Sequence, residues 1–180
     1  VLDRCRGLGR HQVQHVEVGF DDEGRILALD VKFGCAAFMQ TREQARDLAQ
    51  AMVALGNQCG TNTRALLTDM NTPLGRAAGN WLEVKETVDC LEGNGPADLR
   101  QLVVEFAASL LVQTGKAASL EAAREQVAHC LASEAPRRKW DEMLVAQGAD
   151  LDAVNRKLGA NHTAPVVREI KADRSGFVAK

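Results

Sequence analysis

The stretch TDMNTPLGRAAGNWLEVKETVDCLE, from Thr68 to Glu92, combines a strand end, a glycine-rich turn and a carboxylate-bearing helix. In α/β proteins such a join binds anions and small ligands, because strand carboxyl ends and helix N-termini converge there. We expect the turn to leave backbone carbonyls free near Leu74 and Ala77. Glu83 and Glu86 lie one helical turn apart on the same face. Free carbonyls and a carboxylate suit a hard cation, while solvent-facing glutamates remain the alternative.

A second candidate is DVKFGCAAFM, from Asp30 to Met39. A strand that ends in a charged pair, Asp30 and Lys32, is followed by Gly34 and two alanines, which let a ligand approach the backbone closely. The aromatic ring of Phe38 is then a candidate wall of a flat apolar slot. The simpler interpretation is a salt bridge and a tight strand-to-helix turn, with Phe38 in the core.

Other chemical patterns are weak. His11 and His15 have the spacing of a helical metal pair, but they lie in a strand-like stretch that would separate them. No GxGxxG, P-loop or GxSxG motif occurs, so no organic cofactor is predicted. An odd, unclustered set of cysteines fits reduced thiols better than disulfides or a zinc site: Cys5, Cys35, Cys59, Cys90 and Cys130.

The expected elements alternate between strand and helix at first and are then mostly helical. We predict two strands around a turn at Asp22 to Gly24, the second from Ile26 to Val31, and a helix that Thr41 caps with Gln44 in a capping box. A buried strand follows at Arg64 to Met70, so a parallel sheet is expected. Further helices begin near Pro96, Ser119, Pro136 and Leu151, the third with Trp140, Met143 and Leu144 inward. Two strands are predicted around Val166–Ile170 and Phe177–Val178.

Composition limits the class of protein. The chain has 180 residues, 46% of them hydrophobic, which suffices for one domain or one domain and a piece of another. A net charge of −2 gives no broad attraction to nucleic acid or anionic lipid. No apolar run approaches the ~20 residues of a membrane span. We therefore expect a cytoplasmic protein that binds neither nucleic acid nor membrane.

Three blocks of the sequence resemble the thymidine and pyrimidine-nucleoside phosphorylases in order and spacing. They are LALDVKFGCAAFMQTREQARDLAQAMV, LLTDMNTPLGRAAGNWLEVKETVDCLEG, and the helical run from LLVQTGK to MLVAQGAD. The resemblance covers about Leu27 to Lys180. It implies an α/β class, with part of a parallel-sheet domain and flanking helices at 31–160 and the first strands of a C-terminal α+β domain at 161–180.

The resemblance also implies an activity and its site. Family members cleave thymidine and other pyrimidine nucleosides reversibly with phosphate, giving the base and (deoxy)ribose 1-phosphate, and are usually homodimers. By position, Phe38 matches the residue that lines the pyrimidine pocket. Leu74, Ala77 and Glu86 match potassium ligands, two carbonyls and a carboxylate. Potassium is therefore the expected cofactor, in half of a site.

Residues 1–30 depart from the family pattern. They contain no glycine-rich phosphate loop and no Ser-Lys motif that would hold the pyrimidine. We therefore expect the chain alone to be an inactive fragment. The run from His11 to Val31 instead resembles the molybdopterin-binding subunit of xanthine dehydrogenase-like hydroxylases. Two alternatives therefore remain open, a non-catalytic helical or binding protein and a chimeric chain that includes a molybdenum-hydroxylase piece.

Overall fold

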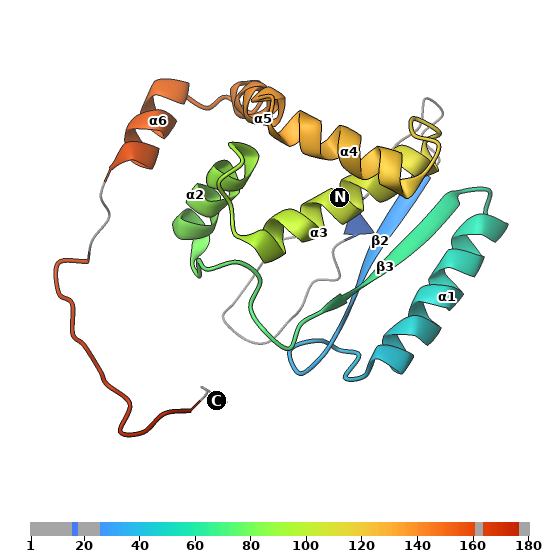
Figure 1. The fold of residues 1–180 in the computed structure, drawn as a ribbon, viewed down its shortest axis with the longest axis horizontal. Helices are drawn as coiled ribbons and strands as arrows, with labels where there is room; N and C mark the ends of the chain where they lie inside the picture. The colour runs from blue at the N-terminus through green and yellow to red at the C-terminus, as the bar shows by residue number, and fades with distance from the viewer. Residues whose placement is uncertain (1–15, 18–25, 161–163, 177–180) are drawn as a thin grey trace. The chain divides into compact units, whose positions relative to one another are not determined.

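The computed structural model describes residues 16–17, 26–160 and 164–176 (Figure 1). The expected turn at Asp22 to Gly24, together with His11, His15, Cys5 and Phe177–Val178, lies outside these residues. The elements follow the order β1 (Val16–Glu17), β2 (Ile26–Phe33), α1 (Arg42–Gln58), β3 (Asn62–Asp69), α2 (Asn80–Leu91), α3 (Ala97–Gln113), α4 (Leu120–Leu131), α5 (Ala135–Ala146) and α6 (Leu151–Gly159).

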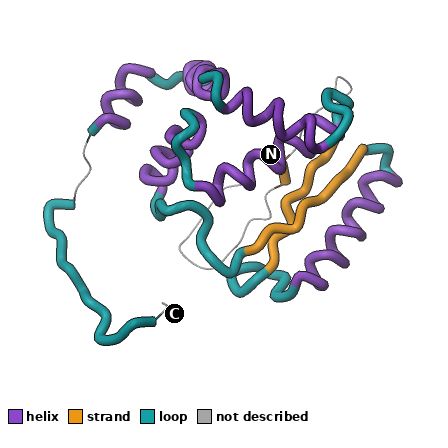
Figure 2. The backbone as a smooth tube through the Cα atoms, in the orientation of Figure 1, coloured by secondary structure: helices purple, strands orange, loops and turns teal. Residues whose placement is uncertain are grey.

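The sheet has the strand order β1-β2-β3. The short β1 pairs antiparallel with β2, with Val16 opposite Leu29. β2 and β3 run parallel in register from Ile26↔Asn62 to Phe33↔Asp69, and Figure 2 shows them side by side. The predicted parallel pair is therefore confirmed, and the carboxyl ends of β2 and β3 lie at one edge of the sheet. That edge carries both candidate turns.

Helix α1 packs on the sheet through the face that its sequence predicts. The Thr41 side chain accepts a hydrogen bond from the Gln44 N–H, and the Gln44 side chain accepts one from the Thr41 N–H, which completes the capping box. Buried Ala45 and Ala49 lie in one hydrophobic cluster with Leu29 and Val31. Small residues let the helix approach the strands closely, which fixes the position of the turn that precedes it.

A second hydrophobic cluster joins α3 to α4. Its buried members are small or branched: Ala108, Ala117, Ala123, Val127 and Leu131. The Ser119 side chain caps α4 as predicted, by accepting from the Ala122 N–H. At the end of α3, the amide nitrogen of buried Gln113 donates to the carbonyls of Leu27 (3.2 Å) and Asn62 (2.6 Å). These two bonds tie α3 to the amino ends of both parallel strands.

Two sequence expectations are wrong. Residues 164–176 form no strand, and the side chains of Val166, Val167 and Ile170 are exposed. A strand needs a neighbour to pair with, and within the described ranges no strand pairs with this segment. Helix α5 has no buried residue, and Met143 is exposed rather than inward.

The chain divides into two compact units, residues 1–140 and 141–180. The sheet, helices α1 to α4 and both candidate turns belong to the first unit. In the part of the chain that the structure describes, no helix combines the length and the apolar character needed to cross a bilayer.

Candidate functional site

The turns that follow β2 and β3 interlock at the carboxyl edge of the sheet. The Met70 N–H donates to the Phe33 carbonyl (2.7 Å), and the Cys35 N–H donates to Oδ1 of Asn71 (3.0 Å). Gly34 has φ +124°, and a Cβ there would stand 2.9 Å from the Asn71 nitrogen. Only glycine accepts both that conformation and that approach. The two candidate turns therefore form one unit of structure.

Below these turns lies a polar network between the two strands. The Lys32 ammonium contacts Oδ2 of Asp30 (2.6 Å) and the Thr68 hydroxyl (3.3 Å), and that hydroxyl donates to Oδ1 of Asp30. Asp30 is buried, and the Lys32 side chain is only 18% exposed. The predicted salt bridge of this pair is confirmed. Both oxygens of the buried Asp30 carboxylate have hydrogen-bond partners. The network therefore joins β2 and β3 next to the carboxyl edge of the sheet.

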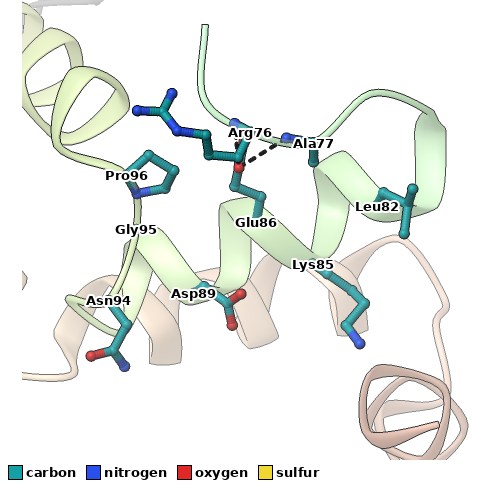
Figure 3. Close-up of a pocket in the computed structure, with 9 residues that line it drawn as sticks. All are labelled: Arg76, Ala77, Leu82, Lys85, Glu86, Asp89, Asn94, Gly95 and Pro96. Atoms are coloured by element: carbon teal, nitrogen blue, oxygen red, sulfur yellow. Dashed lines mark hydrogen bonds between the residues drawn. The ribbon is translucent and has the colours of Figure 1, made fainter. Parts of the chain in front are cut away.

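Glu86 reaches from α2 to the loop that follows β3. Its Oε1 accepts hydrogen bonds from the backbone N–H groups of Arg76 (2.7 Å) and Ala77 (3.0 Å), as Figure 3 shows. Hydrogen bonds to a carboxylate are about twice as strong as those between neutral groups. Glu86 thus fixes the part of the loop that sequence reasoning expected to carry free carbonyls.

The other glutamate of the predicted pair also binds the loop. Oε1 of Glu83 accepts from the Gly79 N–H (2.9 Å), just where α2 begins without a side-chain cap. Glu86 is half-buried and bonded to the loop, so the solvent-facing alternative is wrong for it, whereas Glu83 is exposed and also accepts the Gly79 N–H. The two glutamates hold consecutive parts of the loop against the first turns of α2.

A third carboxylate, Asp98 in the first turn of α3, approaches the same loop. Its Oδ2 accepts from the Gly75 N–H (3.1 Å) and from Nη1 of Arg76 (3.3 Å), and this Nη1 also donates to the Gly75 carbonyl (2.8 Å). Burial alone would raise the pKa of Asp98. The hydrogen bonds from the Gly75 and Leu99 N–H groups and the Arg76 charge outweigh it, so the pKa lies below its ordinary value. Asp98 is thus held in its ionised form.

The oxygen atoms expected to bind a cation remain available. Among the described residues, neither Oε2 of Glu86 nor the carbonyl oxygens of Leu74 and Ala77 accept a hydrogen bond. The described part of the chain has no group of three or more His, Cys, Asp or Glu that could hold a metal. Backbone carbonyls and a carboxylate are the oxygen donor types that hard cations accept.

A cavity of about 600 Å³ lies beside this loop (Figure 3). Arg76, Ala77 and Glu86 form one wall of it, and Asn94, Gly95 and Pro96 line it from the α2–α3 connection. Phe38 lies on the other turn of the edge, between β2 and α1, and is 62% exposed. Its alternative assignment to the core is therefore wrong, while its role at a pyrimidine remains a prediction.

The model of the glycosyl transferase family, a/b domain, matches residues 7–135, which includes both turns, Glu86 and Asp98. The chain belongs to this family. The match begins upstream of Leu27, within the segment that sequence reasoning set apart as atypical.

Within the glycosyl transferase family, the chain is similar to pyrimidine-nucleoside phosphorylases. Those of Staphylococcus aureus strains USA300, NCTC 8325 / PS 47 and COL are each 42% identical over 157 residues, which cover 86% of this chain. The resemblance to thymidine and pyrimidine-nucleoside phosphorylases is thereby confirmed. The chain spans about a third (35%) of the length of these curated relatives.

Sequence reasoning missed two members of the site of this glycosyl transferase domain. Asp98 follows Pro96 at a helix start, a place where an acidic residue is common for helix stability alone, so no local signal connected it to Gly75. Thr68 was assigned only to a strand end. The parallel register, which sets Thr68 opposite Lys32, is what brings its hydroxyl to Asp30.

Proposed function

We propose that this chain supplies the cation-holding part and one pocket wall of an enzyme that cleaves pyrimidine nucleosides reversibly with phosphate. Thymidine is the proposed substrate, and thymine and deoxyribose 1-phosphate are the products. The observation that carries the proposal is the geometry of Glu86, which holds two loop N–H groups through Oε1. Its Oε2 and the Leu74 and Ala77 carbonyls accept no hydrogen bond from any residue that the structure describes. The names of the relatives support the substrate class.

In this proposal each residue has a separate role. The carbonyl oxygens of Leu74 and Ala77 and the Glu86 carboxylate hold a potassium ion, which supplies a fixed positive charge. Glu86 also keeps the loop in shape through its two N–H acceptor bonds. Phe38 covers one face of the base and excludes water from it. Catalysis then depends on positioning and charge stabilisation as the glycosidic bond opens to an oxocarbenium-like centre that phosphate attacks.

We further propose that the 180 residues alone do not turn over nucleoside. No glycine-rich phosphate loop or Ser-Lys word occurs in the sequence, so the charged groups that would hold phosphate and base are not among these residues. The purified chain, incubated with thymidine and phosphate, is expected to release no thymine above the uncatalysed background. Turnover at an ordinary enzymatic rate, about 1 s⁻¹ or more, would contradict this part of the proposal.

A chimera tests the function itself. Residues 27–160 of this chain replace the matching stretch of the S. aureus pyrimidine-nucleoside phosphorylase, and thymine release is measured with phosphate at several potassium concentrations. We expect a potassium-dependent phosphorylase whose activity falls at least about a hundredfold with Glu86→Ala, since a misplaced loop costs that much. The control, Glu125→Ala on the exposed face of α4, is expected to leave the rate unchanged.

The same chimera separates the two classes of function. A chimera that folds and binds potassium but releases no thymine favours the alternative, a non-catalytic binding protein. Homodimer formation and a cytoplasmic location are parts of the proposal that rest on the family resemblance. Sedimentation of the chimera against the parent phosphorylase tests the first of these.

A further inference from the structure

The loop between β3 and α2, residues 70–79, is called the cation loop below. We infer that Asp98 is a positioning residue for this loop. Through its contacts with Gly75 and Arg76, Asp98 holds the loop in the shape that offers the Leu74 and Ala77 carbonyls to a monovalent cation. The inference rests on the cation role proposed above. It assigns Asp98 no contact with the ion or with substrate.

Two carboxylates from different helices accept hydrogen bonds from neighbouring residues of the loop. Glu86 holds the N–H groups of Arg76 and Ala77, and Asp98 holds the N–H of Gly75. Three consecutive backbone N–H groups therefore point to carboxylates from two different helices. Each candidate carbonyl belongs to a residue at or directly beside this run, so the orientation of these peptide groups depends on both helices.

The Arg76 side chain also links Asp98 to the loop. Its Nη1 donates both to the Gly75 carbonyl (2.8 Å) and to Oδ2 of Asp98 (3.3 Å). The guanidinium thus donates to the carbonyl of the residue between Leu74 and Arg76, and Asp98 accepts a second bond from the same nitrogen. With this arrangement the Gly75 carbonyl is used internally, whereas the Leu74 and Ala77 carbonyls stay free of hydrogen bonds within the described residues.

Asp98 is ionised, which is the form that accepts these hydrogen bonds most strongly. The Gly75 N–H and the Arg76 charge favour the carboxylate over the neutral acid, and the low pKa of Asp98 agrees with this. The carboxylate also lies in the first turn of α3, where the helix dipole favours a negative charge. A helix that packs firmly on α4 therefore supplies a fixed anchor for the loop.

The matched control comes from α4. Glu121 occupies the same place after its N-cap Ser119 as Asp98 does after Pro96, and its pKa is also lowered, first through its own backbone N–H and then through Ser119. Among the described residues, Glu121 makes no hydrogen bond or ion pair to the cation loop. Removing it costs a helix-start carboxylate without touching Gly75 or Arg76.

The experiment compares Asp98→Ala, Glu121→Ala and the unchanged chain by amide hydrogen exchange and by a potassium titration. Exchange is measured at Ala77 because its N–H donates to Glu86 and not to Asp98. This arm contains no potassium. We expect Asp98→Ala to speed that exchange about tenfold. The titration follows the Ala77 amide resonance in KCl, with choline chloride at equal ionic strength, and Asp98→Ala is expected to raise the half-saturating potassium concentration about tenfold. Glu121→Ala is expected to change neither quantity.

Each outcome of the exchange and titration experiments either supports or overturns a role of Asp98 or of the cation. Unchanged exchange at Ala77 in Asp98→Ala would overturn the inference, whatever potassium does. Faster exchange with an unchanged half-saturating concentration would also overturn it, because the loop shape would then not control the cation. If the unchanged chain shows no potassium response at all, the proposed cation role fails, while faster exchange in the potassium-free arm still supports Asp98 as the residue that positions the loop.

Discussion

Gly75 and Glu86 lie so close that a Cβ placed on Gly75 would stand 2.1 Å from Oε2 of Glu86. Gly75 also has φ +72°, a conformation that other residues adopt at a cost. The glycine is thus required twice, by its backbone and by the carboxylate beside it. This contact couples the loop to α2 at the point where the candidate ligands lie.

Gly75→Ala is expected to destabilise the protein more than Gly115→Ala does. Gly115 has φ +71°, nearly the same angle, but a Cβ there would have no atom within 4 Å. Gly115→Ala therefore carries only the conformational cost, about 1–2 kcal/mol, while Gly75→Ala must also displace Glu86. Urea unfolding of both variants measures the difference, and equal losses of stability would contradict the tight contact.

Glu86→Gln is expected to lower the free energy of unfolding by about 1–3 kcal/mol, because two hydrogen bonds to a charged acceptor weaken. The same change at exposed Glu125 is expected to have almost no effect. Denaturant unfolding monitored by circular dichroism gives both values. A Glu86→Gln variant as stable as Glu125→Gln would mean that the bonds to Arg76 and Ala77 contribute little.

Asp30→Ala is expected to cost about 3–4 kcal/mol, since it leaves the mostly buried Lys32 ammonium without its carboxylate. Thr68→Val removes only the hydroxyl between them and is expected to cost about 1–2 kcal/mol. Denaturant unfolding of the two variants and of their double variant tests the network. Strictly additive losses would show that Asp30 and Thr68 act independently.

Much of this arrangement follows from local sequence patterns. The Thr41 capping box, the Ser119 cap and the apolar face of α1 were all predictable, because each depends on residues within one or two helical turns. The predicted strand at Val166–Ile170 is wrong because a β-branched run forms a strand only where a neighbour pairs with it. The Asp98–Gly75 bond joins residues 23 positions apart, and no local pattern encodes that contact.

Acid is expected to destabilise the unchanged chain more than Asp98→Asn. The folded-state pKa of Asp98 is lowered, so the unfolded state takes up a proton first as pH falls. Its stabilising contribution is complete above the unfolded pKa of about 3.9 and is lost as pH falls through the lower folded value. Urea unfolding from pH 6 down to pH 3 tests this, and parallel pH profiles for the two proteins would contradict it.

Thiol labelling is expected to separate Cys90 from the other described cysteines. Cys90 is buried, while Cys35, Cys59 and Cys130 are exposed. Burial, together with the Glu86 charge and against Arg100, raises the pKa of the Cys90 thiol, so little thiolate is present near neutral pH. In a Cys5→Ser background at pH 8, we expect Cys90 to react with an aromatic disulfide at least about tenfold more slowly than the other three. Equal rates would mean that Cys90 is not enclosed.

If Glu86 and its loop bind a monovalent cation, the protein is more stable in KCl than in choline chloride at equal ionic strength, and thermal unfolding in the two salts measures this difference. At a potassium concentration about ten times the dissociation constant, mass action adds about 1.4 kcal/mol of stability, which raises Tm by about 3–5 °C for a chain of this size. We expect this potassium-specific rise in the unchanged chain and its loss in Glu86→Ala. Identical Tm values in the two salts, or an undiminished rise in Glu86→Ala, would contradict it.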